Sequence, residues 1–397
     1  MASSADPLPF HENVQSPIIQ GSFDNVASSS LPEIIERMRK EANTTTDQVL
    51  QLNFAKYLLE VDSKIEQDPS ILGAGNEGRA ELIRQRLQGE SIKWYKRLAN
   101  FSSGADKNAC TEAMFNLAEY YGKGLYGLPV DHSKAFSLYL AGSKYSHPGA
   151  TYRAAVCYEV AAGTKKDNVR AFQFYRKAAS LGNSLAMHKL ALILLYGKLD
   201  QRKNLKEGIS WLKRATASAS AAHPESLYDL GQCYEKDGGC PMVIPDEAYA
   251  FELYSKAAHY GYPPAQYRLG AAYEFGLFGC PIDASLSIRW YSKAAEQGLA
   301  DAELALSGWY LSGAEGVIRQ SDADAYLWAR KAAERGHPKA EYAVGHFYEI
   351  GVGVGINIEE AKMWLQQSAQ KGYKRAQQKL NELKKTDKKK ESKCTIM

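Results

Sequence analysis

The chain has 397 residues, of which 45% are hydrophobic and 24% are charged, with 49 basic and 45 acidic side chains. This length exceeds what one compact core usually takes up, so several domains or a repeat array are expected. Residues 1–30 contain no lysine or arginine, which argues against a secretory signal or a transit peptide. The longest strongly apolar run, Leu190 to Tyr196, is far shorter than the roughly 20 residues that span a bilayer.

The N-terminal segment, residues 1–46, is rich in Ser, Pro, Asn and Thr and shows little periodicity except around Pro32 to Glu41. Such a composition predicts a mostly disordered polar tail. Residues 47–112 are predicted to form an N-terminal helical cap. Within this cap, Gln51 to Glu60 and Lys93 to Lys96 resemble the two helices of a degenerate repeat.

One pattern recurs every 36 to 40 residues within residues 113–383. Ala or Ser comes first, usually followed by Leu four residues later and by Tyr after four more, a spacing that places all three on one face of a helix. The seven copies are Ala113/Leu117/Tyr121, Ala150/Ala154/Tyr158, Ala186/Leu190/Leu194, Ser226/Leu230/Tyr234, Ala265/Leu269/Tyr273, Ala302/Leu306/Tyr310 and Ala340/Val344/Tyr348.

A second motif, Lys-Ala-Ala-x-x-Gly, follows in most copies and ends at Gly182, Gly261, Gly298 and Gly336, with a degraded copy that ends at Gly372. Each repeat therefore predicts two amphipathic helices, each stopped by glycine. One hairpin cannot bury both of its apolar faces, so neighbouring hairpins must stack. The predicted fold is all-α, an α-solenoid of TPR-like hairpins that closes with a final capping helix and has disordered tails at both ends.

The motifs that resemble cofactor, metal or catalytic sites are each interpreted as structural features of this chain. Gly122 to Gly127 matches G-x-G-x-x-G, but it follows a helix where a dinucleotide site needs a strand. Cys240 and Cys280 lie in corresponding loops without the four ligands of a structural zinc site, so loop packing is favoured. His147, His223 and His337 each precede a proline at a repeat junction and are interpreted as linker residues. No catalytic residue, metal site or cofactor is expected.

Aromatic side chains recur two positions after the first Ala or Ser of the repeat. They lie about 160° around the helix from the Leu position, given 100° per residue. Recurrence favours packing against the next repeat, whereas a row of tyrosines on a concave surface would bind a protein partner. The candidate partner-binding residues are Phe115, Tyr152, Tyr228, Tyr267 and Tyr342.

The last four residues, Cys394 to Met397, have the C-a-a-X form that marks prenylation of the cysteine, and a final Met favours farnesyl. Residues 384–397 hold 6 of the 49 basic and 2 of the 45 acidic side chains, so 43 of each remain and the body is neutral. A neutral body does not indicate a nucleic-acid partner. One prenyl chain binds membranes marginally, and nearby lysines supply the second signal on an anionic leaflet. These lysines are Lys384, Lys385, Lys388, Lys389, Lys390 and Lys393.

The motif A-x-x-x-L-G-x-x-Y-x-x-G followed by K-A-A-x-x-G resembles the Sel-one-like repeat. A polar tail, a solenoid and a basic prenylated end, together with the leader Gln51 to Glu60, resemble the fungal chitin-synthase regulatory family. This resemblance implies a non-catalytic activator that binds an integral-membrane chitin synthase and is matured by protein farnesyltransferase. It also implies a position at the cytoplasmic face of the plasma membrane, at the septum or growth sites. The alternative is a general prenylated adaptor that scaffolds signalling proteins at the cell cortex.

Overall fold

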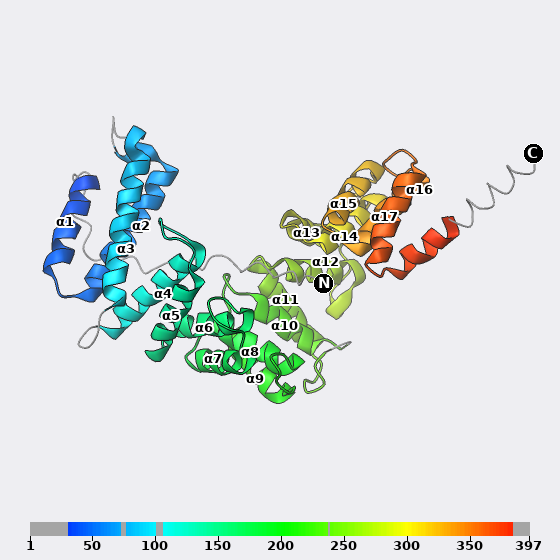
Figure 1. The fold of residues 1–397 in the computed structure, drawn as a ribbon. Coiled ribbons are helices and arrows are strands. Elements are labelled where there is room, and N and C mark those ends of the chain that lie inside the picture. The colour runs from blue at the N-terminus through cyan, green and yellow to red at the C-terminus, as the bar shows by residue number, and fades with distance from the viewer. Residues whose placement is uncertain (1–30, 73–76, 101–105, 237–238, 384–397) are drawn as a thin grey trace, which may run out of the picture. The chain divides into compact units, whose positions relative to one another are not determined.

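The computed structural model describes residues 31–72, 77–100, 106–236 and 239–383, and most of these residues are α-helical (Figure 1). No extended strand occurs among the described residues, where the only β pairings are two isolated bridges. The predicted all-α solenoid of paired helices is therefore confirmed. The chain divides into two compact units, Met1–Ser218 and Ala219–Met397.

The first unit begins with α1 (Leu31–Thr44), a helix within the segment predicted to be a mostly disordered tail. The predicted cap follows with α2 (Gln48–Gln67) and α3 (Ala80–Ala99). The periodic stretch Pro32 to Glu41 falls within α1, while residues 1–30 lie outside the described part of the chain. Helices α2 and α3 pack along each other around Phe54, Leu58, Tyr95 and Leu98, which are all at most 1% exposed. The two predicted helices of the degenerate repeat lie in this pair.

Paired helices form the rest of both units. In the first unit they are α4 (Lys107–Lys123), α5 (His132–Lys144), α6 (Pro148–Val160), α7 (Asn168–Ser180), α8 (Ser184–Tyr196) and α9 (Leu205–Ala217). In the second they are α10 (Glu225–Tyr234), α11 (Glu247–His259), α12 (Pro263–Phe275), α13 (Ala284–Glu296), α14 (Ala300–Ser312), α15 (Asp322–Glu334), α16 (Pro338–Ile350) and α17 (Ile358–Gln370). A last helix begins at residue 374 and is described to residue 383.

Small side chains set the distance between the paired helices. The first Ala of each repeat is fully buried where it occurs, as at Ala113, Ala150 and Ala265, because a larger side chain would force the helices apart. Alanines of the second helix, such as Ala178 and Ala257, are equally buried. The gaps between these close contacts are filled by leucine and tyrosine.

The helix ends follow the sequence signals. Gly124, Gly276 and Gly351 end first helices with φ between 66° and 81°, a left-handed conformation that costs glycine little. Second helices begin at a capping side chain, as at Asp131 and Asp167, each of which accepts a hydrogen bond from a backbone N–H three residues on. Across the described ranges, no helix combines the length and apolarity needed to cross a bilayer.

Candidate partner-binding face

The five predicted aromatic residues all lie on first helices and are all half-buried. Their neighbours lie in their own hairpin and also in the next repeat, in line with the predicted packing: Tyr228 contacts Tyr262 at 5.5 Å, and Tyr152 packs against the cluster that holds Ala186. Three rings contact a tyrosine on the second helix of their own repeat, with centroid distances of 5.4 to 5.8 Å. The pairs are Tyr152 with Tyr175, Tyr228 with Tyr254 and Tyr267 with Tyr291.

Phe115 and Tyr342 complete this set at the two ends of the repeat array. Phe115 contacts Tyr139 of its own repeat at 6.2 Å and stacks on His147 at 5.0 Å. Tyr342 contacts Tyr373, which follows the second helix of its repeat, at 5.4 Å. Each ring is therefore held by its own hairpin, in several cases with the next repeat as well, and stays half-buried. This half-buried arrangement is compatible with a contact surface for another protein.

Beneath these rings lies a repeated hydrogen bond that sequence analysis missed. The second-helix tyrosines are buried, and each donates its hydroxyl to a glutamate on the first helix of the same repeat or, for Glu235, at its C-cap. Burial together with the neighbouring carboxylate raises the pKa of each tyrosine, so the hydroxyl stays protonated. The four pairs are Tyr139 with Glu119, Tyr175 with Glu159, Tyr254 with Glu235 and Tyr291 with Glu274.

A basic side chain from the following repeat joins three of these pairs. Arg153 lies 2.8 Å from Glu119, Lys189 lies 3.0 Å from Glu159, and Arg268 contacts Glu235 through Nε at 3.1 Å. Burial opposes ionisation of Glu119, but Arg153 and the Tyr139 hydroxyl outweigh it, so the pKa of Glu119 is lowered. We call each such set a Tyr–Glu–cation link. These links join consecutive hairpins within a unit.

Two of the junction histidines, which were interpreted as linker residues, have a specific structural role. Nδ1 of His147 accepts the backbone N–H of Ala150 at 3.0 Å, and Nδ1 of His337 accepts that of Ala340 at 3.2 Å, so both are helix caps. Their Nε2 atoms lie 3.1 Å from Glu112 and Asp301, respectively. His223 precedes Pro224, the cap position of α10, which has no side-chain cap hydrogen bond.

The loop cysteine Cys280 donates its thiol to the carbonyl oxygens of Ala272 and Leu277 within its own repeat, at 3.2 and 3.0 Å. Burial raises the pKa of this thiol. The contacts of Cys280 agree with its predicted role in loop packing. Within the described ranges, no group of three or more His, Cys, Asp and Glu side chains is placed to hold a metal ion.

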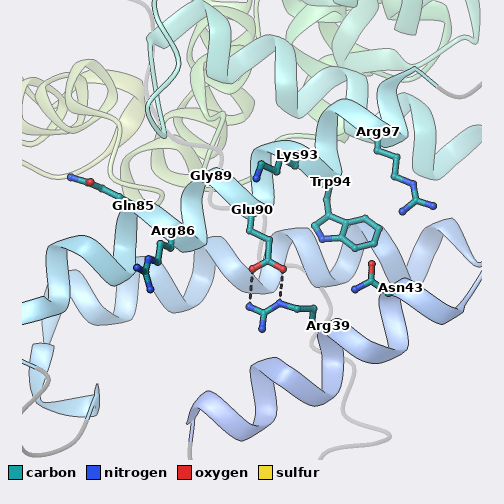
Figure 2. Close-up of a pocket in the computed structure, with 9 residues that line it drawn as sticks. All are labelled: Arg39, Asn43, Gln85, Arg86, Gly89, Glu90, Lys93, Trp94 and Arg97. Carbon is teal, nitrogen blue, oxygen red and sulfur yellow. Dashed lines mark hydrogen bonds and ion pairs between the residues drawn. The ribbon is translucent and has the colours of Figure 1, made fainter.

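A basic cleft of about 710 Å³ lies between α1 and α3 (Figure 2). Arg86, Lys93 and Arg97 line it from α3, and Arg39 reaches Glu90 from α1 through two hydrogen bonds of 2.7 and 2.8 Å. The bidentate pair spans the cleft and fixes α1 against the cap. The three α3 cations are spaced so that they share one helical face, and this spacing could have indicated the basic side of the cleft from sequence. Its partner on α1 lies 51 residues away from Glu90 and had no such signal.

The farnesylation candidate Cys394 and the lysines Lys384, Lys385, Lys388, Lys389, Lys390 and Lys393 lie outside the described residues. The structure therefore positions the candidate contact face and leaves the predicted anchor as an inference from sequence.

Stacked helical hairpins that repeat one half-buried aromatic position define a helical-repeat protein of the solenoid class. The family model described as the Sel1 repeat matches seven segments, residues 111–144, 148–183, 184–220, 224–261, 263–299, 300–337 and 338–373. The chain thus belongs to the Sel1-repeat proteins.

Two curated relatives are similar over most of this chain. The chitin synthase regulatory factor 3 of Schizosaccharomyces pombe is 36% identical over 87% of the chain, which covers 36% of that protein. The chitin synthase regulator SKT5 of Saccharomyces cerevisiae is 32% identical over 91% of the chain, which covers 51% of that protein. The chain therefore spans about a third to a half of these relatives.

Among solved structures, the c5321 protective antigen of uropathogenic Escherichia coli, described as an SLR fold, superposes with a TM-score of 0.64. It is 23% identical, and the match covers 88% of this chain and 67% of that one. This likeness concerns the fold alone.

Proposed function

We propose that this chain is a non-catalytic, membrane-tethered regulatory scaffold that activates or localises a chitin synthase for cell-wall and septum chitin synthesis. The observation that carries the proposal is the similarity, over 87% and 91% of the chain, to two proteins named for chitin synthase regulation. Stacked helical hairpins are suited to this role, because repeat proteins bind other proteins through the surfaces that stacking creates.

The proposed anchor combines two membrane signals at the C-terminal segment. Farnesyl on Cys394 supplies the lipid, and the six lysines before it attract the anionic cytoplasmic leaflet. Protein farnesyltransferase would attach the lipid. Confinement to the leaflet raises the effective concentration of the scaffold near an integral-membrane synthase, so a modest direct affinity is sufficient.

The proposed contact is the aromatic face. Its tyrosines are half-buried and held by ring contacts with their own hairpins, so little side-chain entropy is lost on binding. The Tyr–Glu–cation links hold successive rings at fixed separations within a unit. A partner would therefore meet preformed rings within each unit.

The anchoring part is tested by Cys394→Ser, with Thr395→Ala as the matched control that keeps the C-a-a-X form. The serine variant is expected to leave the membrane fraction and to lower chitin deposition, whereas the alanine variant behaves as the parent. A serine variant that still sediments with membranes and supports full chitin deposition would show that the anchor is wrong.

The contact part is tested by purifying Tyr152→Ser/Tyr267→Ser from fungal membranes in mild detergent. We expect loss of the co-purifying multispanning synthase, while Tyr145→Ser, an exposed tyrosine outside the row, retains it. Thermal melts of both variants establish that they are folded. Unchanged recovery of the synthase contradicts the assigned face, and recovery of kinases or small GTPases in its place favours the adaptor function.

A further inference from the structure

The loops that join the two helices of the first three repeats form one edge of the first unit. All three loops close in the same way, since the residue before the second helix donates its backbone N–H to the first helix. The donors are Asp131, Asp167 and Asn204, with acceptors Tyr121, Tyr158 and Leu194, at 2.8 to 3.0 Å. The loops therefore repeat one shape along the stack.

Neighbouring loops are also in direct contact. Asn168 at the end of the second loop donates to Asp200 in the third at 2.7 Å. Gly163 in the second loop, with φ of 70°, lies so close to the carbonyl oxygen of His132 at the start of α5 that no side chain fits there. The three loops thus make a continuous surface, which we call the basic loop edge and define as residues 123–134, 160–170 and 196–203.

Apolar side chains project from this edge into solvent. Val130, Val160, Val169 and Tyr196 are each 56 to 60% exposed. They come from three successive repeats, and they stand singly between polar residues without lining a groove. Exposed apolar side chains on adjacent elements indicate an interaction surface.

The charge of the same edge is positive. Its acids Asp131 and Asp167 are paired with Lys134 and Arg170, at 3.0 and 3.4 Å, and Asp200 accepts from Asn168. No ion-pair partner occurs among the described residues for the exposed Lys165, Lys166, Arg202 and Lys203. The corresponding loops of the second unit also expose apolar side chains, such as Ile244 and Ile356, but beside acids such as Glu247 and Glu359.

We propose that the basic loop edge lies on an anionic lipid bilayer, with its apolar side chains in the interfacial region and its lysines and arginines at the headgroups. Lysine is depleted from the cores of protein interfaces, whereas lysines interleaved with single apolar side chains are typical of surfaces that bind anionic membranes. This contact is separate from prenylation, and it orients the first unit on a leaflet to which the farnesyl group retains the chain.

The test uses the full chain carrying Cys394→Ser, so that no lipid is attached, and vesicles of phosphatidylcholine with or without phosphatidylserine. In this background, Lys165→Glu/Lys166→Glu is expected to lower the partition coefficient on phosphatidylserine vesicles by about ten-fold. Val160→Ser/Val169→Ser is expected to lower it several-fold with little change in salt dependence. The C-terminal lysines are the same in every variant.

The matched control is Lys144→Glu/Tyr145→Ser, which alters an exposed lysine and an exposed tyrosine at the opposite end of the hairpin. It is expected to bind as the parent does, and thermal melts check that each variant folds. Parent-like binding by both edge variants overturns the proposal, as does a loss in the control that is equally large per unit of charge changed, which would mean that net charge alone matters. Edge variants that keep vesicle binding but lose cross-linking to an acidic protein would assign the edge to that protein.

Discussion

At the residue scale, His147 joins two tasks at one repeat junction. Its Nδ1 caps α6 through Ala150, and its Nε2 reaches Glu112 on the preceding first helix. Asn183 holds the corresponding place before α8 and caps it through Ala186 at 2.8 Å. Asn is therefore sufficient to cap the helix, and the longer imidazole of His147 adds a bridge to the neighbouring hairpin.

Substitution of His147 separates these tasks. His147→Ala removes the cap and the bridge and should lower the free energy of unfolding by about 1 to 2 kcal/mol. His147→Asn keeps the cap and should lose less than half of that amount. Urea denaturation followed by circular dichroism measures both, and equal losses in the two variants would contradict the capping role.

Glu112 gives this junction a dependence on pH. The hydrogen bond with His147, with Lys56 nearby, lowers its pKa from 4.5 to about 2. Because the folded-state pKa is depressed, the stabilisation is fully present above about pH 4.5 and is lost as the pH falls toward 2. We expect the difference in unfolding free energy between the parent and Glu112→Gln to shrink over this window. A difference that stays constant between pH 6 and pH 2 would refute the assignment.

At the scale of elements, the Tyr–Glu–cation links are the clearest addition to the predicted hairpins. In the link formed by Tyr254, Glu235 and Arg268, the carboxylate is only 15% exposed and depends on partners from two other helices. Removing its cation leaves a largely buried charge compensated only by a hydroxyl. Removing the hydroxyl leaves the charge pair in place.

Arg268→Met should therefore lower the unfolding free energy by about 2 kcal/mol, and Tyr254→Phe by about 1 kcal/mol. Arg176→Met is the control, because Arg176 and its partner Glu207 are much more exposed and such pairs contribute under about 1 kcal/mol. Chemical denaturation of the three variants gives the order. A loss for Arg268→Met no greater than that of the control would mean that the link is not structural.

The sequence predicted these elements well and their links poorly, for a physical reason. Helical spacing and glycine stops are local, so they located the hairpins from Ala113 onward. The glutamate of the first link, Glu119, is displaced along its helix by one turn relative to Glu159, Glu235 and Glu274. A glutamate that lies one helical turn away can still reach the corresponding tyrosine in space, but it no longer shares a position with the other glutamates when the repeats are aligned.

The aromatic row shows the same limit. Its positions on first helices were predicted from spacing, while the contact of Tyr152 with its own hairpin depends on the angle at which α6 meets α7. The pairing of Arg39 with Glu90 likewise depends on how α1 docks on α3. Such angles arise from packing between helices, which no single helical pattern contains.

At the scale of the whole molecule, the identity of the lipid is the most direct prediction. Met397 favours farnesyl and a final Leu favours geranylgeranyl, so Met397→Leu should change the lipid on Cys394 and leave the repeats unaffected. Mass spectrometry of the C-terminal peptide from fungal cells distinguishes the two lipids. An unmodified cysteine in both proteins would show that the segment is not prenylated.

The links between hairpins do not continue evenly through the second unit. Glu274 accepts from Tyr291, but the next repeat has Ala305 at the position of the cation, which is Arg153 or Arg268 in earlier links. The same repeat has Ala329 at the position that the buried tyrosine occupies in the linked repeats. Under a pulling force, the boundary between α13 and α14 has fewer charged ties to break than the boundary between α10 and α12. If the second unit is loaded along the chain, we expect its repeats to separate at that boundary before they separate between α10 and α12.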